Sequence, residues 1–169
     1  TDRTTWLIIC LITATMTGFI IQRYESLLAA SVALTAYIPM LMDSGGNAGS
    51  QASTTVIRFL YTGDIGFTDT LRVIWKEARV GLMTGLVLVV VNFIRMTILG
   101  PETLPIKLTV SLTLLITVTL SKVVGGMLPL IADKINVDPT VMAGPIISTL
   151  VGTLAPLVYF EVASHLLNL

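Results

Sequence analysis

Long runs of apolar residues alternate with short charged clusters along this chain. A helix needs roughly 20 residues to cross a hydrocarbon core of about 30 Å, and the runs reach that length. The strands of a membrane barrel are shorter and alternate apolar with polar residues, a pattern that these runs lack. The pattern therefore predicts an all-α membrane protein with five transmembrane helices, over about residues 5–22, 27–60, 80–99, 108–132 and 141–160.

The composition agrees with a membrane protein. Of the 169 residues, 54% are hydrophobic and 12% are charged, and the mean hydropathy is +0.89. This apolar share is above that of an ordinary soluble domain. The net charge of zero gives no reason to expect a nucleic-acid partner, and the single cysteine, Cys10, excludes an internal disulfide. We expect residues 1–169 to form one transmembrane domain.

A segment between the second and third runs, residues 67–79, has a mixed character. It follows a break at Gly63 and Gly66 and combines basic with apolar positions. One helical face gathers its apolar residues, Leu71, Ile74, Trp75 and Ala78. The segment is predicted to be amphipathic and to lie at the inner membrane interface, with Trp75 as an anchor.

Basic residues indicate the orientation, because Lys and Arg collect in short cytoplasmic loops. With the N-terminus inside, the inner side holds six of them and the outer side three, namely Arg3, Arg58, Arg72, Lys76, Arg79 and Lys134 against Arg23, Arg95 and Lys107. This bias predicts a cytoplasmic N-terminus and a C-terminus outside. The chain opens Thr-Asp-Arg, without an initiator Met or a signal-peptide pattern, so we expect upstream cytoplasmic domains that are absent from it.

The stretch PMLMDSGGNAGSQAS, residues 39–53, gathers small residues inside the second run. Gly45, Gly46 and Gly49 give the backbones of two helices room to approach closely. Small residues spaced by four positions are typical of helix packing in membranes. Packing of helices, within or between subunits, is one explanation of this stretch.

Packing does not explain Asp43, Asn47 and Gln51. They are spaced by four residues, so they share one helical face. A carboxylate and two amides facing lipid would cost free energy, and this face should therefore meet protein or water. Oxygen ligands suit hard cations, including ions that keep their hydration shell. The stripe predicts a cation path lined by these three residues.

At these residues the sequence resembles the second transmembrane helix of the MgtE family of magnesium channels and transporters, whose pattern is P-x-L-x-x-x-G-G-N-x-G-x-Q-x-[AS]-[ST]. The stretch VVGGMLPLIADKINVDPTVMAGPIISTL, residues 123–150, is similar to the family's fourth and fifth helices. The resemblance implies a homodimer in a bacterial inner membrane, with five helices per subunit and a Mg²⁺ pore near the two-fold axis. It further implies Mg²⁺-sensing cytoplasmic domains in a full-length protein, and no cofactor besides the ion.

The fifth helix departs from the family pattern T-x-x-D-x-x-G-x-x-x-Y-F. In the family the aspartate holds hydrated Mg²⁺, whereas this chain has Gly152 at that position. The resemblance implies that Ser148, Thr149 and Gly152 line the path on this helix. Hydroxyl and backbone oxygens would then take over the contacts of the missing carboxylate.

Lys122 is a second departure, because the family usually has a small or amide residue there. Counting from the loop between the fourth and fifth helices places Lys122 level with Gly152, near the middle of the bilayer. A Lys at that depth costs at least ~2.5–3.5 kcal/mol and needs a partner or water. We predict that Lys122 lines the path and pairs with Asp43, or with the amides of Asn47 and Gln51, within or between subunits.

Asp138 has two readings. It precedes Pro139 and suits an N-cap of the fifth helix, with proline at the first helical position. By resemblance it also matches an acid at the cytoplasmic mouth of the family's pore, where metal binds. Both roles are compatible, and Asn47 and Asp138 are the candidate metal-binding residues.

Three functions remain open. The first is a pore that passively conducts Mg²⁺ or another divalent cation. The second is a transporter coupled to Na⁺ or H⁺ in which Lys122 titrates or is displaced by an ion. The third is a divergent, non-conducting membrane subunit, because Gly152 replaces the pore acid. No catalytic, phosphate-binding or zinc motif surrounds the one histidine, His165, so an enzyme is not expected.

Overall fold

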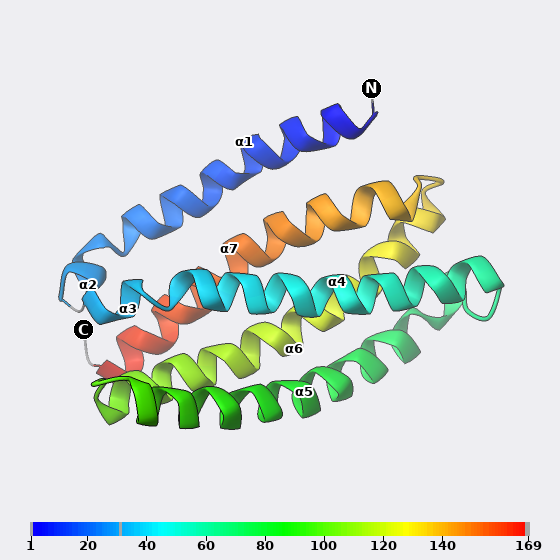
Figure 1. Cartoon of the computed structure of the whole chain (residues 1–169). Helices are drawn as coiled ribbons and strands as arrows, with labels where there is room; N and C mark the ends of the chain where they lie inside the picture. The colour runs from blue at the N-terminus through cyan, green and yellow to red at the C-terminus, as the bar shows by residue number, and fades with distance from the viewer. Residues whose placement is uncertain (1, 31, 168–169) are drawn as a thin grey trace.

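The computed structural model describes residues 2–30 and 32–167, and within these ranges every regular element is helical (Figure 1). The elements in chain order are α1 (Asp2–Arg23), α2 (Glu25–Ala30), α3 (Val32–Thr35), α4 (Ile38–Thr62), the 3-10 turn η1 (Phe67–Asp69), α5 (Thr70–Leu99), α6 (Leu104–Lys134) and α7 (Pro139–Leu167). The long helices α1, α4, α5, α6 and α7 correspond to the five apolar runs.

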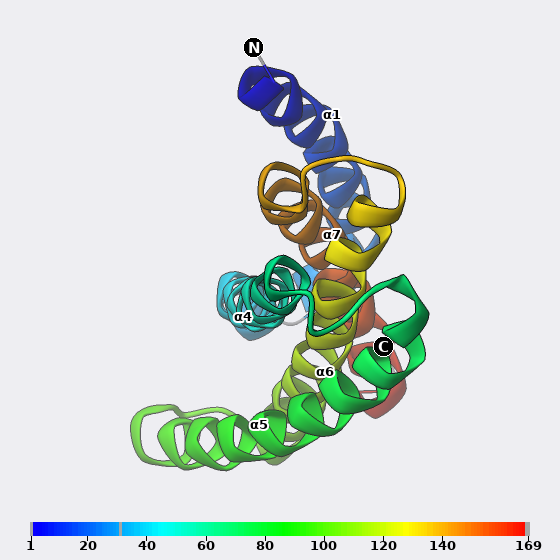
Figure 2. The ribbon, with the colours of Figure 1, turned by 90° about the vertical axis from the view of Figure 1, so that its right-hand side faces the viewer.

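Helix α6 lies at the centre of the bundle and packs against α4, α5 and α7. Seen along the bundle, α1, α7, α6 and α5 form a curved row, and α4 lies on its concave side (Figure 2). Helix α4 is therefore supported by α6 and α7, while its other side carries a row of exposed residues. This open side of α4 decides where the candidate site lies.

Among the described residues, three segments are long and apolar enough to cross a membrane, namely Phe67–Leu99, Leu104–Lys134 and Pro139–Leu167. Helix α1 contains a shorter apolar segment, Leu7–Arg23. Helix α4 has 25 residues but includes the polar stretch 39–53, which lowers its hydropathy. Length and composition thus support α5, α6 and α7 as spans most directly.

The run expected as one helix over residues 27–60 is divided into α2, α3 and α4. Helix α4 begins at Ile38 and has Pro39 in its first turn, where the missing proline N–H is not needed. Next to the break, the buried Tyr159 of α7 donates its hydroxyl to the carbonyl of Leu34 at 2.9 Å. This hydrogen bond connects the segment between α3 and α4 to the core of the bundle.

The expected interfacial segment 67–79 and the expected span 80–99 form one continuous structure, in which η1 leads directly into α5. Leu71 and Trp75 are 82% and 66% exposed, whereas Val73 and Glu77 are only 6% and 4% exposed. The apolar face of this segment therefore points away from the bundle, an arrangement that lipid contact stabilises. The side that faces the bundle carries the carboxylate of Glu77.

Candidate cation path

The polar residues of α4 lie on its open side. Asp43, Asn47 and Gln51 are exposed, whereas Gly45, Ala48, Gly49 and Ala52 on the opposite side are buried against the bundle. The division follows from the helical period, since residues four apart share a face. We call the exposed side, with Asp43, Asn47, Ser50, Gln51 and Thr54, the polar face of α4.

Glycines bring α4 close to the rest of the bundle. A Cβ atom added at Gly49 would lie 3.0 Å from the Ser121 carbonyl oxygen, and one at Gly125 would lie 2.7 Å from the Gly49 carbonyl carbon. Gly45 is equally restricted, because Thr117 and Val151 lie 2.7 Å from the position of its missing Cβ. Helices α4 and α6 therefore cross almost backbone to backbone, as small residues allow.

Gly46 differs from the two glycines beside it. No atom lies within 4 Å of the position that its Cβ would take. Among the described residues, Gly46 therefore makes no close helix contact of the kind that Gly45 and Gly49 make, and its expected packing role stays a prediction. Instead, Gly46 lines a cavity on the polar face.

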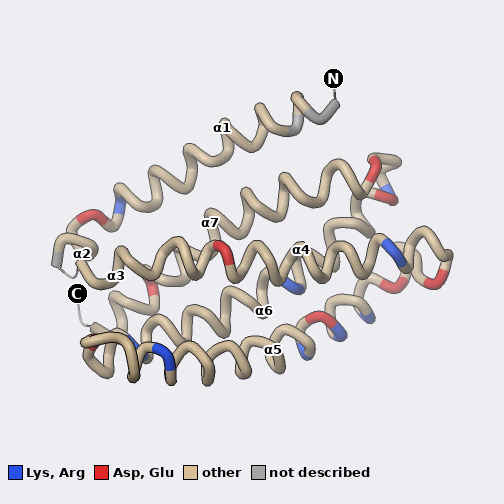
Figure 3. Tube along the Cα trace, viewed as in Figure 1, with Lys and Arg blue, Asp and Glu red and all other residues tan. Residues whose placement is uncertain are grey.

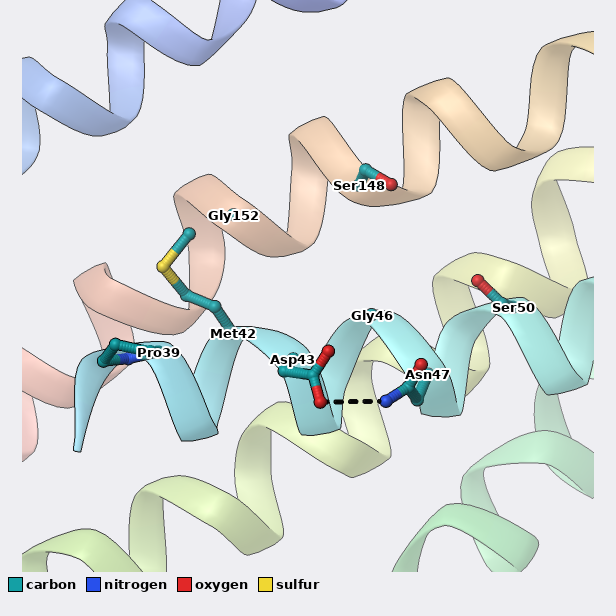
Figure 4. A pocket seen from close by; sticks show the side chains of 8 residues that line it. All are labelled: Pro39, Met42, Asp43, Gly46, Asn47, Ser50, Ser148 and Gly152. Atoms are coloured by element: carbon teal, nitrogen blue, oxygen red, sulfur yellow. Dashed lines mark hydrogen bonds between the residues drawn. The ribbon is translucent and has the colours of Figure 1, made fainter.

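A cavity of about 500 Å³ lies between α4 and α7 (Figure 4). Within it the amide of Asn47 donates a hydrogen bond of 3.1 Å to the carboxylate of Asp43. Helix α7 contributes Ser148 and Gly152, and the full lining is Pro39, Met42, Asp43, Gly46, Asn47, Ser50, Ser148 and Gly152. The cavity joins two of the residues expected on α4 to two of those expected on α7.

A second cavity, of about 720 Å³, continues along α4 and is lined by Asn47, Ser50, Gln51, Thr54 and Thr55. Asn47 and Ser50 belong to both cavities, so the two form one strip. Pro39 and Thr55 are 16 positions apart, which is about 24 Å at about 1.5 Å per helical residue. The strip thus covers most of a hydrocarbon core of about 30 Å.

Gly152, which occupies the position of the family's pore acid, is bonded to a side chain of α1. Its carbonyl accepts a hydrogen bond of 3.1 Å from the hydroxyl of Thr17. Pro156, four residues later, has no N–H for this carbonyl, so the hydroxyl satisfies an oxygen that the helix leaves free. A Cβ at Gly152 would meet Met42 at 3.5 Å and Thr17 at 3.7 Å, which are ordinary contacts. There is room here for a larger side chain.

Thr149 does not belong to the residues that line these cavities. Its hydroxyl lies 3.1 Å from that of Thr13 on α1, and the thiol of Cys10 donates to the Pro145 carbonyl at 3.4 Å. Thr149 therefore contacts α1, and its expected place on the path beside Ser148 and Gly152 stays a prediction. In α7 only the latter two reach the cavity.

Helix α1 supplies contacts that the sequence interpretation missed. Cys10, Thr13 and Thr17 fall at helical spacing and all bond to α7. Their spacing of three and four residues on an otherwise apolar helix was the available signal. These three side chains help to attach α1 to α7 at the edge of the bundle.

Lys122 is 6% exposed, and its Nζ donates to the amide oxygen of Gln51 at 3.5 Å. Of the partners considered for it, the structure thus pairs Lys122 with Gln51, while Asp43 accepts from Asn47. An ammonium therefore lies directly behind the polar face of α4. It binds the same amide that lines the second cavity.

Asp138 lies apart from the two cavities, immediately before α7. Its carboxylate accepts hydrogen bonds from the Thr140 backbone N–H at 2.8 Å and hydroxyl at 2.7 Å. Both hydrogen bonds stabilise the charged carboxylate and hold the pKa of Asp138 below its usual value. The bond from the Thr140 hydroxyl has the larger effect. The geometry is that of an N-cap, as the sequence predicts.

No group of three or more His, Cys, Asp and Glu side chains with the spacing of a metal site occurs in the part of the chain that the structure describes. The oxygen atoms of the polar face come mainly from amides and hydroxyls, with one carboxylate, Asp43. Such a donor set fits an ion that keeps its water shell better than one bound directly by several carboxylates.

Comparison with known proteins extends these observations. The family model MgtE, described as a divalent cation transporter, matches residues 38–162. The chain belongs to the MgtE family. The magnesium transporter MgtE of Thermus thermophilus is 38% identical over 167 residues, which are 98% of this chain and 36% of that protein. The MgtE relatives are transporters, not enzymes.

Two further MgtE relatives match over a similar span. The magnesium transporter MgtE of Enterococcus faecalis is 32% identical over 96% of this chain and 36% of its own length, and that of Bacillus subtilis is 31% identical over 98% and 37%. The chain thus spans little more than a third of these relatives. The matched MgtE region contains both cavities of the polar face.

Proposed function

We propose that this chain is the membrane part of a Mg²⁺ transporter that conducts the hydrated ion passively along the polar face of α4. The observation that carries the proposal is the pair of joined cavities along α4, whose polar residues run from Asp43 to Thr55, about 18 Å at about 1.5 Å per residue, on a helix whose opposite side is buried. Asp43, amides and hydroxyls exposed to lipid would be costly, so the strip requires water, an ion or another chain.

The chemistry of the strip suits a hydrated divalent cation. Mg²⁺ gives up its water reluctantly and is usually bound through few protein oxygens. Asn47, Ser50 and Gln51 present amide and hydroxyl oxygens to the water shell, and Asp43 adds one negative charge. On α7, Ser148 adds a hydroxyl to the strip, while the Gly152 carbonyl accepts one hydrogen bond from Thr17.

A homodimer completes this path in the proposal. The polar face is open on one side, and a second copy that contributes the same face would enclose the strip around a two-fold axis. Gly46, with no neighbour within 4 Å of its missing Cβ, gives the second copy a place to approach. The pore would then be lined twice by each residue of the polar face.

The remaining assignments follow the family. We propose a bacterial inner membrane as the location, with the N-terminus cytoplasmic and the C-terminus outside. The end of the bundle that contains Arg58, Arg72, Lys76 and Lys134 would then face the cytoplasm. Asp138 lies at this end and is proposed to bind Mg²⁺ at the inner mouth. Cytoplasmic Mg²⁺-sensing domains are the proposed partners in a longer protein.

Ion flux into proteoliposomes tests the proposal. We expect the chain to conduct Mg²⁺. We expect Asn47→Ala and Gln51→Ala each to reduce the Mg²⁺ flux about tenfold. A tenfold change corresponds to about 1.4 kcal/mol, which is the size of one hydrogen bond. Gln22→Ala is the matched control, because Gln22 is an exposed amide on α1 outside the strip. Gly152→Asp is expected to increase the flux, since the site has room for a side chain.

The outcome that contradicts the proposal is equally clear. Equal Mg²⁺ flux in Asn47→Ala, Gln51→Ala and Gln22→Ala would exclude the polar face as the path. Flux that appears only in Gly152→Asp would show that this chain retains the scaffold but does not conduct without the acid.

A coupled transporter is the second candidate, favoured by the burial of Lys122 at 6% exposure beside Gln51. The ammonium of Lys122 binds an amide that lines the path, so a passing cation can compete with it for the oxygen of Gln51. In a passive pore, Lys122→Met should raise Mg²⁺ flux because it removes a repulsive charge, and Lys122→Arg should not. In a coupled transporter Lys122→Met should abolish flux driven by a Na⁺ or H⁺ gradient.

A further inference from the structure

Glu77 of α5 is a buried carboxylate outside the proposed path. It is 4% exposed and lies against α6, where a Cβ added at Gly126 would approach its Cγ to 2.9 Å. Any side chain larger than that of glycine at position 126 would therefore force the Glu77 side chain to move. Within residues 2–30 and 32–167, no hydrogen bond or ion pair joins the Glu77 carboxylate to another residue.

This carboxylate borders a cavity of about 300 Å³ at the end of the bundle where α4 leads into α5. Asp64, from the loop between the two helices, lines the same cavity. One Asp64 oxygen accepts from the Thr62 hydroxyl at 2.5 Å, so the other remains available. The complete lining is Val56, Phe59, Asp64, Ile65, Arg72, Val73, Lys76 and Glu77. Acidic and basic residues gather at this end of the bundle (Figure 3).

The nearby cations do not neutralise Glu77. The Lys76 ammonium lies 5.2 Å from the centroid of the Phe59 ring and interacts with its π face. Arg72 is exposed and forms no ion pair with Glu77. Lys122 lies one helical turn from Gly126 along α6, but its Nζ donates to Gln51 of α4. The Glu77 carboxylate therefore borders the cavity without a close ion pair, although Arg72 and Lys76 line the same cavity.

An ionised carboxylate that is removed from water without a partner is strongly destabilising, so it takes up either a proton or a cation. We propose that the cavity binds a hydrated divalent cation between Glu77 and Asp64. Two carboxylates plus water are the usual ligands of Mg²⁺ in proteins. Six waters at about 30 Å³ each occupy about 180 Å³, which the cavity accommodates.

The site is separate from the polar face of α4. None of the residues around this cavity lines either cavity of the proposed path. Because Asp64 belongs to the α4–α5 loop and Glu77 packs on α6, an ion held by both ties three elements together at one end of the bundle. Binding there does not require that the chain conducts ions, so the inference stands apart from the proposed function.

Binding of Mn²⁺ to the detergent-solubilised chain, followed by the loss of the free-ion EPR signal, tests this site. We expect Glu77→Gln to remove one bound Mn²⁺ per chain, and Asp64→Asn to weaken the same site about tenfold. Asn47→Ala, in the polar face, should leave this site intact. Mg²⁺ should raise the thermal unfolding midpoint of the wild type, with a smaller increase in Glu77→Gln.

Glu161→Gln is the matched control, since Glu161 is an exposed carboxylate of α7 that bonds to Tyr24 at 2.7 Å. It should bind as many Mn²⁺ ions as the wild type. Equal Mn²⁺ counts in the wild type and Glu77→Gln would overturn the proposal. Should Glu77→Gln fail to fold, an unchanged affinity in Asp64→Asn, which alters only an exposed loop, overturns it equally.

Discussion

At the scale of single residues, Asp138 links a local hydrogen-bond pattern to a measurable pH dependence. Thr140 stabilises the charged carboxylate, so the folded-state pKa of Asp138 lies below its unfolded value of about 3.9. A group with a lowered folded pKa contributes stability above the unfolded pKa. That contribution is lost as the pH falls through the folded pKa.

We therefore predict that Asp138→Ala lowers the thermal unfolding midpoint at about pH 7, and that its difference from the wild type narrows below about pH 4. Asp133→Ala is the control, because Asp133 is exposed in the last turn of α6, where a negative charge does not stabilise the helix. A difference that stays constant down to about pH 3 would mean that the charge of Asp138 has no part in the cap.

The partner of Lys122 illustrates what a sequence can predict about single residues. The spacing placed Asp43, Asn47 and Gln51 on one face, and the structure shows this face as exposed. The spacing alone could not decide between Asp43 and Gln51 as the partner of Lys122, because it does not say where along α4 the helix α6 crosses. The actual crossing of α4 and α6 at Gly49 and Gly125 brings Gln51 to Lys122.

At the scale of helices, the crossing of α4 and α6 depends on Gly125. An added methyl group there would meet the Gly49 backbone, which cannot rotate away as a side chain does. We predict that Gly125→Ala destabilises the folded chain by about 1–3 kcal/mol, despite the higher helix propensity of Ala. The measurement is the unfolding midpoint in detergent.

Gly46→Ala is the matched control for this prediction. It lies on the same helix as Gly49, but its missing Cβ has no neighbour within 4 Å. Its stability should remain equal or rise by up to about 1 kcal/mol through the gain in helix propensity. If both substitutions have the same effect on the unfolding midpoint, close backbone contact does not hold α4 to α6.

Helix α5 shows why a hydrophobic pattern alone is ambiguous in a membrane protein. Leu71 and Trp75, which the sequence places on one apolar face, are both exposed, and Glu77 is turned toward α6. In water an apolar face indicates the core, whereas in lipid it is equally stable on the outside. The break before α4 was missed for a related reason, since the apolar run continues through it.

At the scale of the whole molecule, the arrangement leaves one feature without a partner. Exposed apolar residues cover the outer sides of α1 and α5, as a lipid-facing surface requires, with Leu11 at 71% and Val87 at 63% exposure. The polar face of α4 is the exception. Its cavities of about 500 and 720 Å³ lie along α4, the helix on the concave side of the row (Figure 2). A polar strip in a lipid-facing position is the physical argument for a second copy.

Cysteine cross-linking tests this argument directly. In a Cys10→Ser background, Ser50→Cys places a thiol in the strip that both cavities share. We predict that a short bismaleimide reagent converts Ser50→Cys in membranes to a species of twice the mass, because the two copies of the polar face lie across a water-filled path. Leu86→Cys, on the lipid-facing side of α5 at 52% exposure, should remain monomeric. If Leu86→Cys cross-links while Ser50→Cys does not, the copies meet through α5, and the strip on α4 must be covered by something other than this chain.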